Sequence, residues 1–142
     1  MTQSSPRWIR LAIWSIVVHA LFSTLHGAAH QHLLVKLSLL QTLFVAIVIS
    51  ISPIVAGILL WKRVERVGAI LLVLSMLASL IFGAYNHFVA ISPDHVSHLV
   101  NVTNTYWVRI FQSTAVIIAV IETFGIWLGI RILKSGQDMR SV

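Results

Sequence analysis

The chain has 142 residues, of which 58% are hydrophobic and only 10% are charged, and its mean hydropathy is +0.92. Soluble domains carry about a quarter charged residues, so this composition excludes an ordinary water-soluble domain and indicates one compact membrane domain. The net charge of +6 arises from short basic clusters beside apolar runs, without the basic and aromatic interleaving of an RNA-binding face, so we expect no nucleic-acid partner. The absence of cysteine excludes disulfides and thiolate metal sites.

Four apolar segments, at about residues 8–29, 33–61, 67–90 and 106–133, are long enough to cross a bilayer as helices. The second exceeds the required length and contains Pro53, which predicts a kink. The sequence therefore predicts an all-α fold class: a polytopic four-transmembrane-helix bundle formed by residues 1–142 as a single domain. We also expect a short helix in the loop between the third and fourth spans, because Ser92, Pro93 and Asp94 follow the pattern of a helix start.

The distribution of Lys and Arg predicts the orientation of the four spans. Loops on the cytoplasmic side of a membrane retain positive charge. An arrangement with both termini inside places only Lys36 and Arg109 outside. It places eight basic residues inside: Arg7, Arg10, Lys62, Arg63, Arg66, Arg131, Lys134 and Arg140. We therefore expect a multi-pass integral membrane protein with both termini in the cytoplasm (N-in/C-in).

The first span has an alternative interpretation as a cleaved signal peptide. Two arginines precede its apolar run, and the small residues 27–29 offer a cleavage site. His19 lies inside the apolar run, which argues against a disposable segment.

One face of the first span is lined with histidine. At about 100° per residue, His19, His26 and His30 fall within about 40° of one another. Unsatisfied polar groups in hydrocarbon cost several kcal/mol, so this face is expected to point into the bundle. A rise of about 1.5 Å per residue places both His19 and Glu122 roughly 13 to 14 Å from the inner basic belt. We therefore expect an intramembrane polar pair of His19 and Glu122.

The remaining candidate residues gather at the outward-facing end. The same count places His26, His30 and His87 about 24 to 31 Å above the inner belt, and His95 and His98 follow in the outer loop. Neutral imidazole is a common ligand of zinc, copper and iron, so all five histidines are candidate metal ligands. In a second interpretation, His26 and His87 are the axial ligands of a b-type haem held between helices.

Three functions remain open from the sequence. In the first, the outward-facing histidine cluster binds a transition metal or haem and serves metal handling, electron transfer or oxidation chemistry. In the second, the protein is a proton-coupled carrier in which His19 and Glu122 bind and release protons near the middle of the membrane. In the third, it is a non-catalytic subunit or assembly factor of a larger membrane complex, or a homo-oligomer, that packs through small residues such as Gly125 and Gly129. No HExxH or other catalytic motif is present, so whether the protein is an enzyme stays open and no catalytic residue is predicted.

Overall fold

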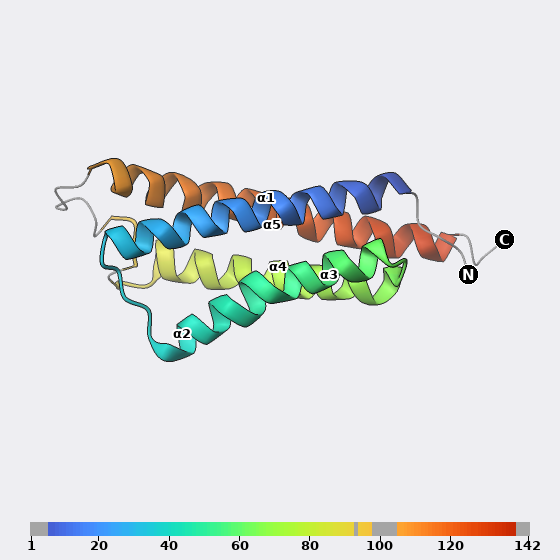
Figure 1. The fold of residues 1–142 in the computed structure, drawn as a ribbon, viewed down its shortest axis with the longest axis horizontal. Helices are drawn as coiled ribbons and strands as arrows, with labels where there is room; N and C mark the ends of the chain where they lie inside the picture. The colour runs from blue at the N-terminus through green and yellow to red at the C-terminus, as the bar shows by residue number, and fades with distance from the viewer. Residues whose placement is uncertain (1–5, 93, 98–104, 139–142) are drawn as a thin grey trace.

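The computed structural model describes residues 6–92, 94–97 and 105–138, and it is all-α. Four helical segments are long and apolar enough to cross a membrane: Pro6–His32, Leu39–Trp61, Glu65–Val89 and Thr105–Ser135. The predicted four apolar spans are thereby confirmed. The segments run along one axis (Figure 1), and large apolar side chains such as Leu21 and Val120 are exposed on the outside, as suits a surface in contact with lipid.

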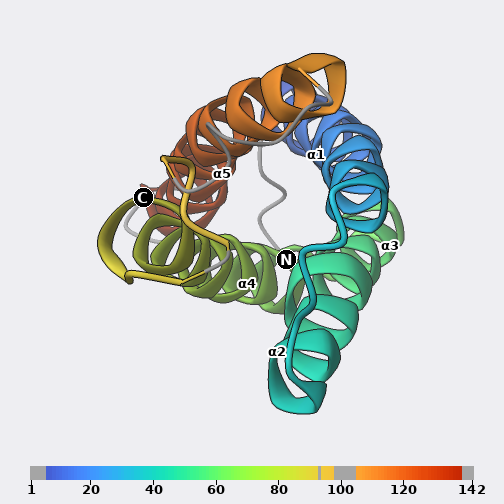
Figure 2. The ribbon, with the colours of Figure 1, turned by 90° about the vertical axis from the view of Figure 1, so that its left-hand side faces the viewer.

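Viewed from one end, the helices form a ring (Figure 2). Around this ring α1 (Pro6–His32) packs against α5 (Thr105–Asp138), α5 packs against α4 (Glu65–Ala84), and α4 packs against α3 (Ser52–Trp61). Each span runs opposite to the next along the chain, so α1 begins and α5 ends at the same end of the bundle (Figure 1).

The second span begins later than the sequence predicted. Residues 33–38 form a loop, because Ser38 starts the helix with a capping box: its Oγ accepts from the Gln41 N–H at 3.2 Å, and Gln41 Oε1 accepts from the Ser38 N–H at 2.9 Å. The span then comprises α2 (Leu39–Phe44), a π-helix η1 (Val45–Ile51) and α3.

The irregularity expected at Pro53 takes the form of this π-helix, which ends just before the proline. Proline lacks the N–H that an α-helix requires, and its ring clashes with the carbonyl four residues earlier, so the preceding turns widen. At its first residues, away from α3, α2 points away from the other helices (Figures 1 and 2).

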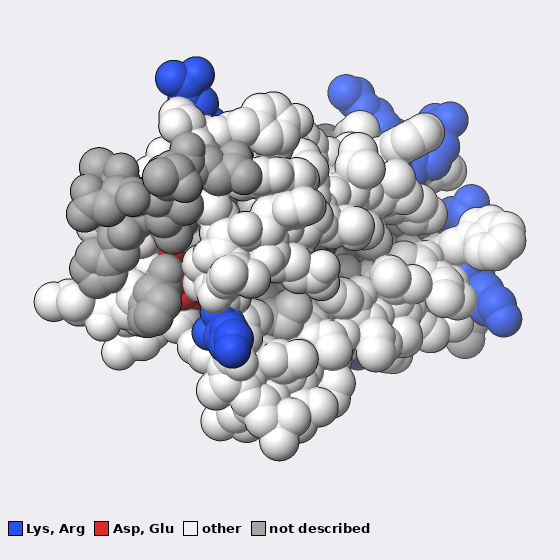
Figure 3. All heavy atoms as spheres, turned by 60° about the vertical axis from the view of Figure 1, so that its left-hand side comes forward, with Lys and Arg blue, Asp and Glu red and all other residues white. Residues whose placement is uncertain are grey.

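Most Lys and Arg side chains gather at the end of the bundle where α1 begins (Figure 3). That end also contains the turn between α3 and α4 and the last turns of α5. Lys36, in the loop after α1, and Arg109, in the first turns of α5, lie toward the other end. We call the two ends the basic end and the histidine end.

The half of the bundle toward the basic end has a packed apolar core. Its buried members are Ile9, Ala12, Ile16, Ala56, Leu60, Ala69, Leu72, Met76, Leu128 and Ile132. Two glycines let α5 approach α4 here: a Cβ at Gly129 would lie 2.5 Å from Val73 Cγ2, and a Cβ at Gly125 would lie 3.2 Å from Met76 Cγ. Gly125 and Gly129 therefore pack inside the chain, which corrects the expectation that they offer a surface to a partner.

The loop after the third span folds back over the histidine end. The span finishes in a π-helix, η2 (Tyr85–Val89), and the Val96 N–H then donates to the His87 carbonyl at 3.0 Å. Within residues 90–92 and 94–97 the chain forms turns, with the Asp94 N–H donating to Ser92 Oγ at 3.3 Å. The expected short helix is not seen in these residues; Pro93 and residues 98–104 lie outside the described chain.

Candidate metal centre

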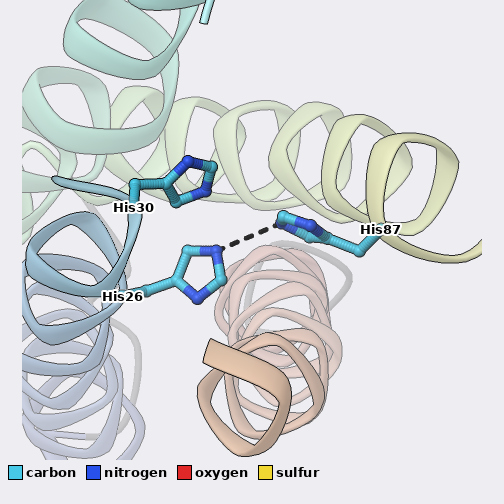
Figure 4. Close-up of side chains that lie close together, drawn as sticks. All are labelled: His26, His30 and His87. Carbon is cyan, nitrogen blue, oxygen red and sulfur yellow. Dashed lines mark hydrogen bonds between the residues drawn. The ribbon is translucent and has the colours of Figure 1, made fainter. Parts of the chain in front are cut away.

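Three histidines converge at the histidine end of the bundle (Figure 4). His26 and His30 lie one turn apart near the end of α1, and His87 comes from η2. One ring nitrogen from each lies within 4.8 Å of the corresponding nitrogens of the other two. The closest approach joins His26 Nε2 to His87 Nε2, at 3.2 Å. This trio of His26, His30 and His87 is called the histidine cluster below.

The local helix geometry explains how His87 reaches the cluster. In η2 the Ala90 N–H donates to the Tyr85 carbonyl, five residues earlier, at 2.7 Å. A π-turn is wider than an α-turn and changes the direction of the side chains it carries, and such turns recur at functional sites. Asn86 anchors the same turn to the second span, because its Oδ1 accepts from Gln41 Nε2 at 3.2 Å.

Two of the imidazoles use Nδ1 to donate a hydrogen bond away from the cluster. His87 Nδ1 lies 3.0 Å from the Asp94 carbonyl, and His30 Nδ1 lies 3.4 Å from the Val35 carbonyl. Carbonyl oxygens only accept, so both Nδ1 atoms carry a proton.

The partner of His26 permits two positions for the imidazole proton. His26 Nδ1 lies 2.8 Å from Thr114 Oγ1, and that hydroxyl also lies 2.6 Å from the Ile110 carbonyl and can donate to either. With its proton on Nε2, His26 donates to His87 Nε2 at 3.2 Å, the hydrogen bond drawn in Figure 4. With its proton on Nδ1, both Nε2 atoms present lone pairs that a shared cation can bind.

A buried carboxylate completes the group. Asp94 is 5% exposed, and its Oδ1 lies 3.2 Å from His30 Nε2 and 3.4 Å from His87 Nδ1. Among the described residues Oδ1 has no partner in normal hydrogen-bond geometry. The arrangement thus collects lone pairs and a negative charge without a matching cation. Leaving such groups unsatisfied costs about 1–3 kcal/mol each, so either added protons or a metal ion would stabilise it.

An aromatic ring packs against all three imidazoles of the histidine cluster. Phe111, fully buried on α5, has its ring centroid 4.6, 5.0 and 5.3 Å from those of His26, His30 and His87, respectively. An apolar wall lowers the local dielectric and strengthens interactions between imidazoles and a cation.

The expected intramembrane pair is present at the next level toward the basic end. His19 Nε2 lies 3.2 Å from Glu122 Oε1, and both residues are almost completely buried. Ser79 of α4 donates a hydrogen bond to the same oxygen. This pair ties α1, α4 and α5 together midway along the bundle, where the sequence predicted it.

A cavity of about 530 Å³ joins the two levels. His26, His30, His87 and Asp94 line one end, and Ser79 and Glu122 line the other. Between them the wall includes Ser23 of α1, whose buried hydroxyl has no hydrogen-bond partner among the described residues. The histidine cluster is therefore accessible from within the bundle.

Two further predicted metal ligands, His95 and His98, are not part of the histidine cluster that the structure describes. His95 does not belong to any metal-ligand group of the described residues; its Nδ1 lies 3.2 Å from the Ser97 N–H, in the loop. His98 lies outside the described residues, so its assignment stays a prediction. His32, not a predicted ligand, stacks on Trp107 with ring centroids 4.0 Å apart.

The geometry also distinguishes the two cofactor interpretations. A haem iron between two histidines needs their nitrogens about 4 Å apart across the porphyrin plane, at about 2 Å per bond. His26 and His87 instead touch directly, with Nε2 atoms 3.2 Å apart. This contact favours a single ion shared by several imidazoles over a haem between those two.

Sequence reasoning missed two residues of the site, Asp94 and Thr114. Asp94 was interpreted as a charge at a helix start, whereas the loop carries it over His87. Thr114 gave no signal, because its role depends on α1 and α5 being neighbours. Comparisons of the chain with protein-family models, with curated proteins and with solved structures find no match.

Proposed function

We propose that this protein is a multi-pass membrane protein that binds one divalent transition-metal ion through His26, His30 and His87, with Asp94 as a nearby carboxylate. The observation that carries the proposal is the convergence of three imidazole nitrogens within 4.8 Å of one another, with Nε2 of His26 and Nε2 of His87 3.2 Å apart. Two imidazole ligands of one tetrahedral ion stand about 3.3 Å apart, given bond lengths of about 2.0–2.1 Å, so this pair needs almost no adjustment.

The surroundings of the histidine cluster support the same proposal. Metal-bound histidines commonly donate their second ring N–H to a carbonyl or another oxygen, which fixes the tautomer and orients the ring. Thr114 and the carbonyls of Asp94 and Val35 are placed for this role. Three imidazoles suit Zn²⁺, Cu²⁺ or Fe²⁺, and three protein ligands leave a coordination position that can open toward the cavity.

We further propose that the histidine end faces away from the cytoplasm and that both termini lie inside. Support comes from the basic residues collected at the other end, since cytoplasmic segments retain positive charge. In this orientation the metal site would exchange its ion with the outer side.

The test is the metal content of the protein purified in mild detergent without chelators and then loaded with Zn²⁺ or Co²⁺. We expect one ion per chain, loss of that ion in His26→Ala and His87→Ala, and retention in the control variants His32→Ala and His95→Ala. Absence of bound metal from the loaded protein, or equal loss in the controls, would overturn the proposal.

A proton-coupled carrier is the second candidate, supported by Glu122. This carboxylate is buried midway along the bundle, is paired with His19, and lines the cavity that also reaches the histidine cluster. Intramembrane ionisable groups commonly mark ion pathways. Metal flux into proteoliposomes should then depend on an opposing proton gradient and fall in Glu122→Gln; flux unaffected by either change would exclude this candidate.

A further inference from the structure

The cavity beneath the histidine cluster has the dimensions and lining of a small-molecule site. Its volume of about 530 Å³ falls within the roughly 300–1,000 Å³ typical of ligand pockets, which combine apolar walls with a few placed polar groups. The wall between its two polar ends is mainly apolar and includes Val45, Ile49, Phe82 and Ile118. Such a wall suits a hydrocarbon body better than a chain of water molecules.

The cavity opens at the side of the bundle, between the outer end of α1 and α2. Five of its six exposed lining residues lie there: Gly27 and Gln31 of α1, Leu34 and Lys36 of the following loop, and Thr42 of α2; the sixth is Phe88 of η2. In Figure 2, α2 points away from the ring of helices at this end. An entrance here would face the lipid and its headgroup layer.

The charges around the cavity favour a ligand with an anionic head. Lys36 is the one Lys or Arg among the described lining residues, and it lies at the entrance. Of the two acids in the lining, Glu122 already pairs with His19 and Ser79, which leaves Asp94 beside the histidines. The two positive charges of a divalent ion in the histidine cluster would exceed the single negative charge of Asp94. The entrance and the metal site together would therefore carry a net positive charge.

We propose that the cavity binds a bilayer-soluble amphiphile, with its hydrocarbon body against the apolar wall and an anionic oxygen head on the metal. This inference rests on the proposed metal site. It adds a substrate class: a single-chain carboxylate or a molecule of similar chemistry that enters laterally between α1 and α2. The head occupies the coordination position that the three histidines leave open.

The experiment uses the full-length protein loaded with Co²⁺, whose visible spectrum responds to a change of ligand. Octanoate and acetate carry the same head, and they are titrated separately at a fixed detergent concentration. We expect both to shift the spectrum, with an apparent Kd at least about tenfold lower for octanoate, because each buried methylene strengthens binding severalfold. Octanoate that binds no more tightly than acetate would overturn the proposal.

Variants separate cavity binding from partition into detergent. A Cβ at Gly27 would meet no atom within 4 Å, so Gly27→Phe can be accommodated while its ring obstructs the entrance. Leu21→Phe is the matched control, since Leu21 is 67% exposed on α1 and lines none of the described pockets. Gly27→Phe should weaken octanoate binding at least tenfold and leave acetate binding unchanged, whereas Leu21→Phe should change neither.

A second variant tests whether Gly27→Phe acts by blocking the cavity or by disturbing the neighbouring His26. Ile49→Trp fills the cavity from the opposite wall, on η1, and should weaken octanoate in the same way. Persistence of tight octanoate binding in both Gly27→Phe and Ile49→Trp would refute the cavity as its site. A protein that takes up no Co²⁺ at all would overturn the proposed function and this inference together, whereas Co²⁺ uptake without a chain-length effect would overturn only the inference.

Discussion

Replacing Thr114 by valine removes one hydroxyl and tests whether its hydrogen bond to His26 orients that imidazole for metal binding. Thr114 Oγ1 is hydrogen-bonded to His26 Nδ1 at 2.8 Å, and the residue is 2% exposed, so water cannot take its place. Without the hydroxyl, His26 either keeps an unsatisfied buried N–H or moves its proton to Nε2, where it can bond His87. An unsatisfied buried donor costs about 1–3 kcal/mol, and the proton shift removes the lone pair that the metal needs.

Both outcomes weaken metal binding by a similar amount. Loss of such a supporting hydrogen bond typically lowers metal affinity about 10- to 100-fold, equivalent to about 1.4–2.7 kcal/mol. In the metal-free protein the hydrogen bond between His26 Nε2 and His87 Nε2 remains available to the variant, so the thermal stability of that form should change little. Thr114→Ser keeps the hydroxyl and should stay close to wild type.

The assay is competition for Zn²⁺ against a chromophoric chelator, alongside thermal unfolding of the metal-free protein in detergent. Thr123→Val is the matched control, because Thr123 lies exposed on the same helix and its hydroxyl bonds to the Ala119 carbonyl of its own helix, at 2.8 Å. Unchanged affinity in Thr114→Val, or an equal loss in Thr123→Val, would refute the reasoning.

Further predictions concern the carboxylate, the protons and the packing. Asp94→Asn removes the only charge within 3.4 Å of the described cluster and should lower Zn²⁺ affinity at least about tenfold in the same competition assay, and unchanged affinity would remove Asp94 from the site. Because each proton bound at an Nε2 removes a ligand, the apparent affinity should fall steadily as the pH is lowered from 8 to 4, and a flat profile over that range would argue against imidazole ligation. Gly129→Ala should lower the unfolding temperature, because its Cβ would meet Val73 Cγ2 at 2.5 Å and the Ala69 carbonyl at 3.2 Å, whereas Gly27→Ala meets nothing within 4 Å and should not; equal effects would contradict the packing of α5 on α4.

Hydropathy predicted the four spans well, and it failed where an apolar loop resembles a helix. Residues 33–37 are almost all apolar, so the second span was placed six residues early at residue 33 instead of Leu39. The true start was readable from the capping box of Ser38 and Gln41. The π-helices at η1 and η2 were not predicted, because periodicity alone does not separate them from α-helix.

The site was predictable in proportion to how much of it lies on a single helix. Helical spacing placed His19, His26 and His30 on one inward face, and depth counting matched His19 to Glu122 across two helices. The same count put His87 at the right height. The contribution of Asp94 depends on the loop folding back over His87, and a sequence gives no rule for that path.

The most direct test of the central claim is X-ray absorption at the metal edge of the loaded protein. We expect three imidazole nitrogens at about 2.0–2.1 Å from one ion in the wild type, and loss of this imidazole-ligated metal signal in His26→Ala. A spectrum with no imidazole ligands, or one that His26→Ala leaves unchanged, would contradict a metal centre built from His26, His30 and His87.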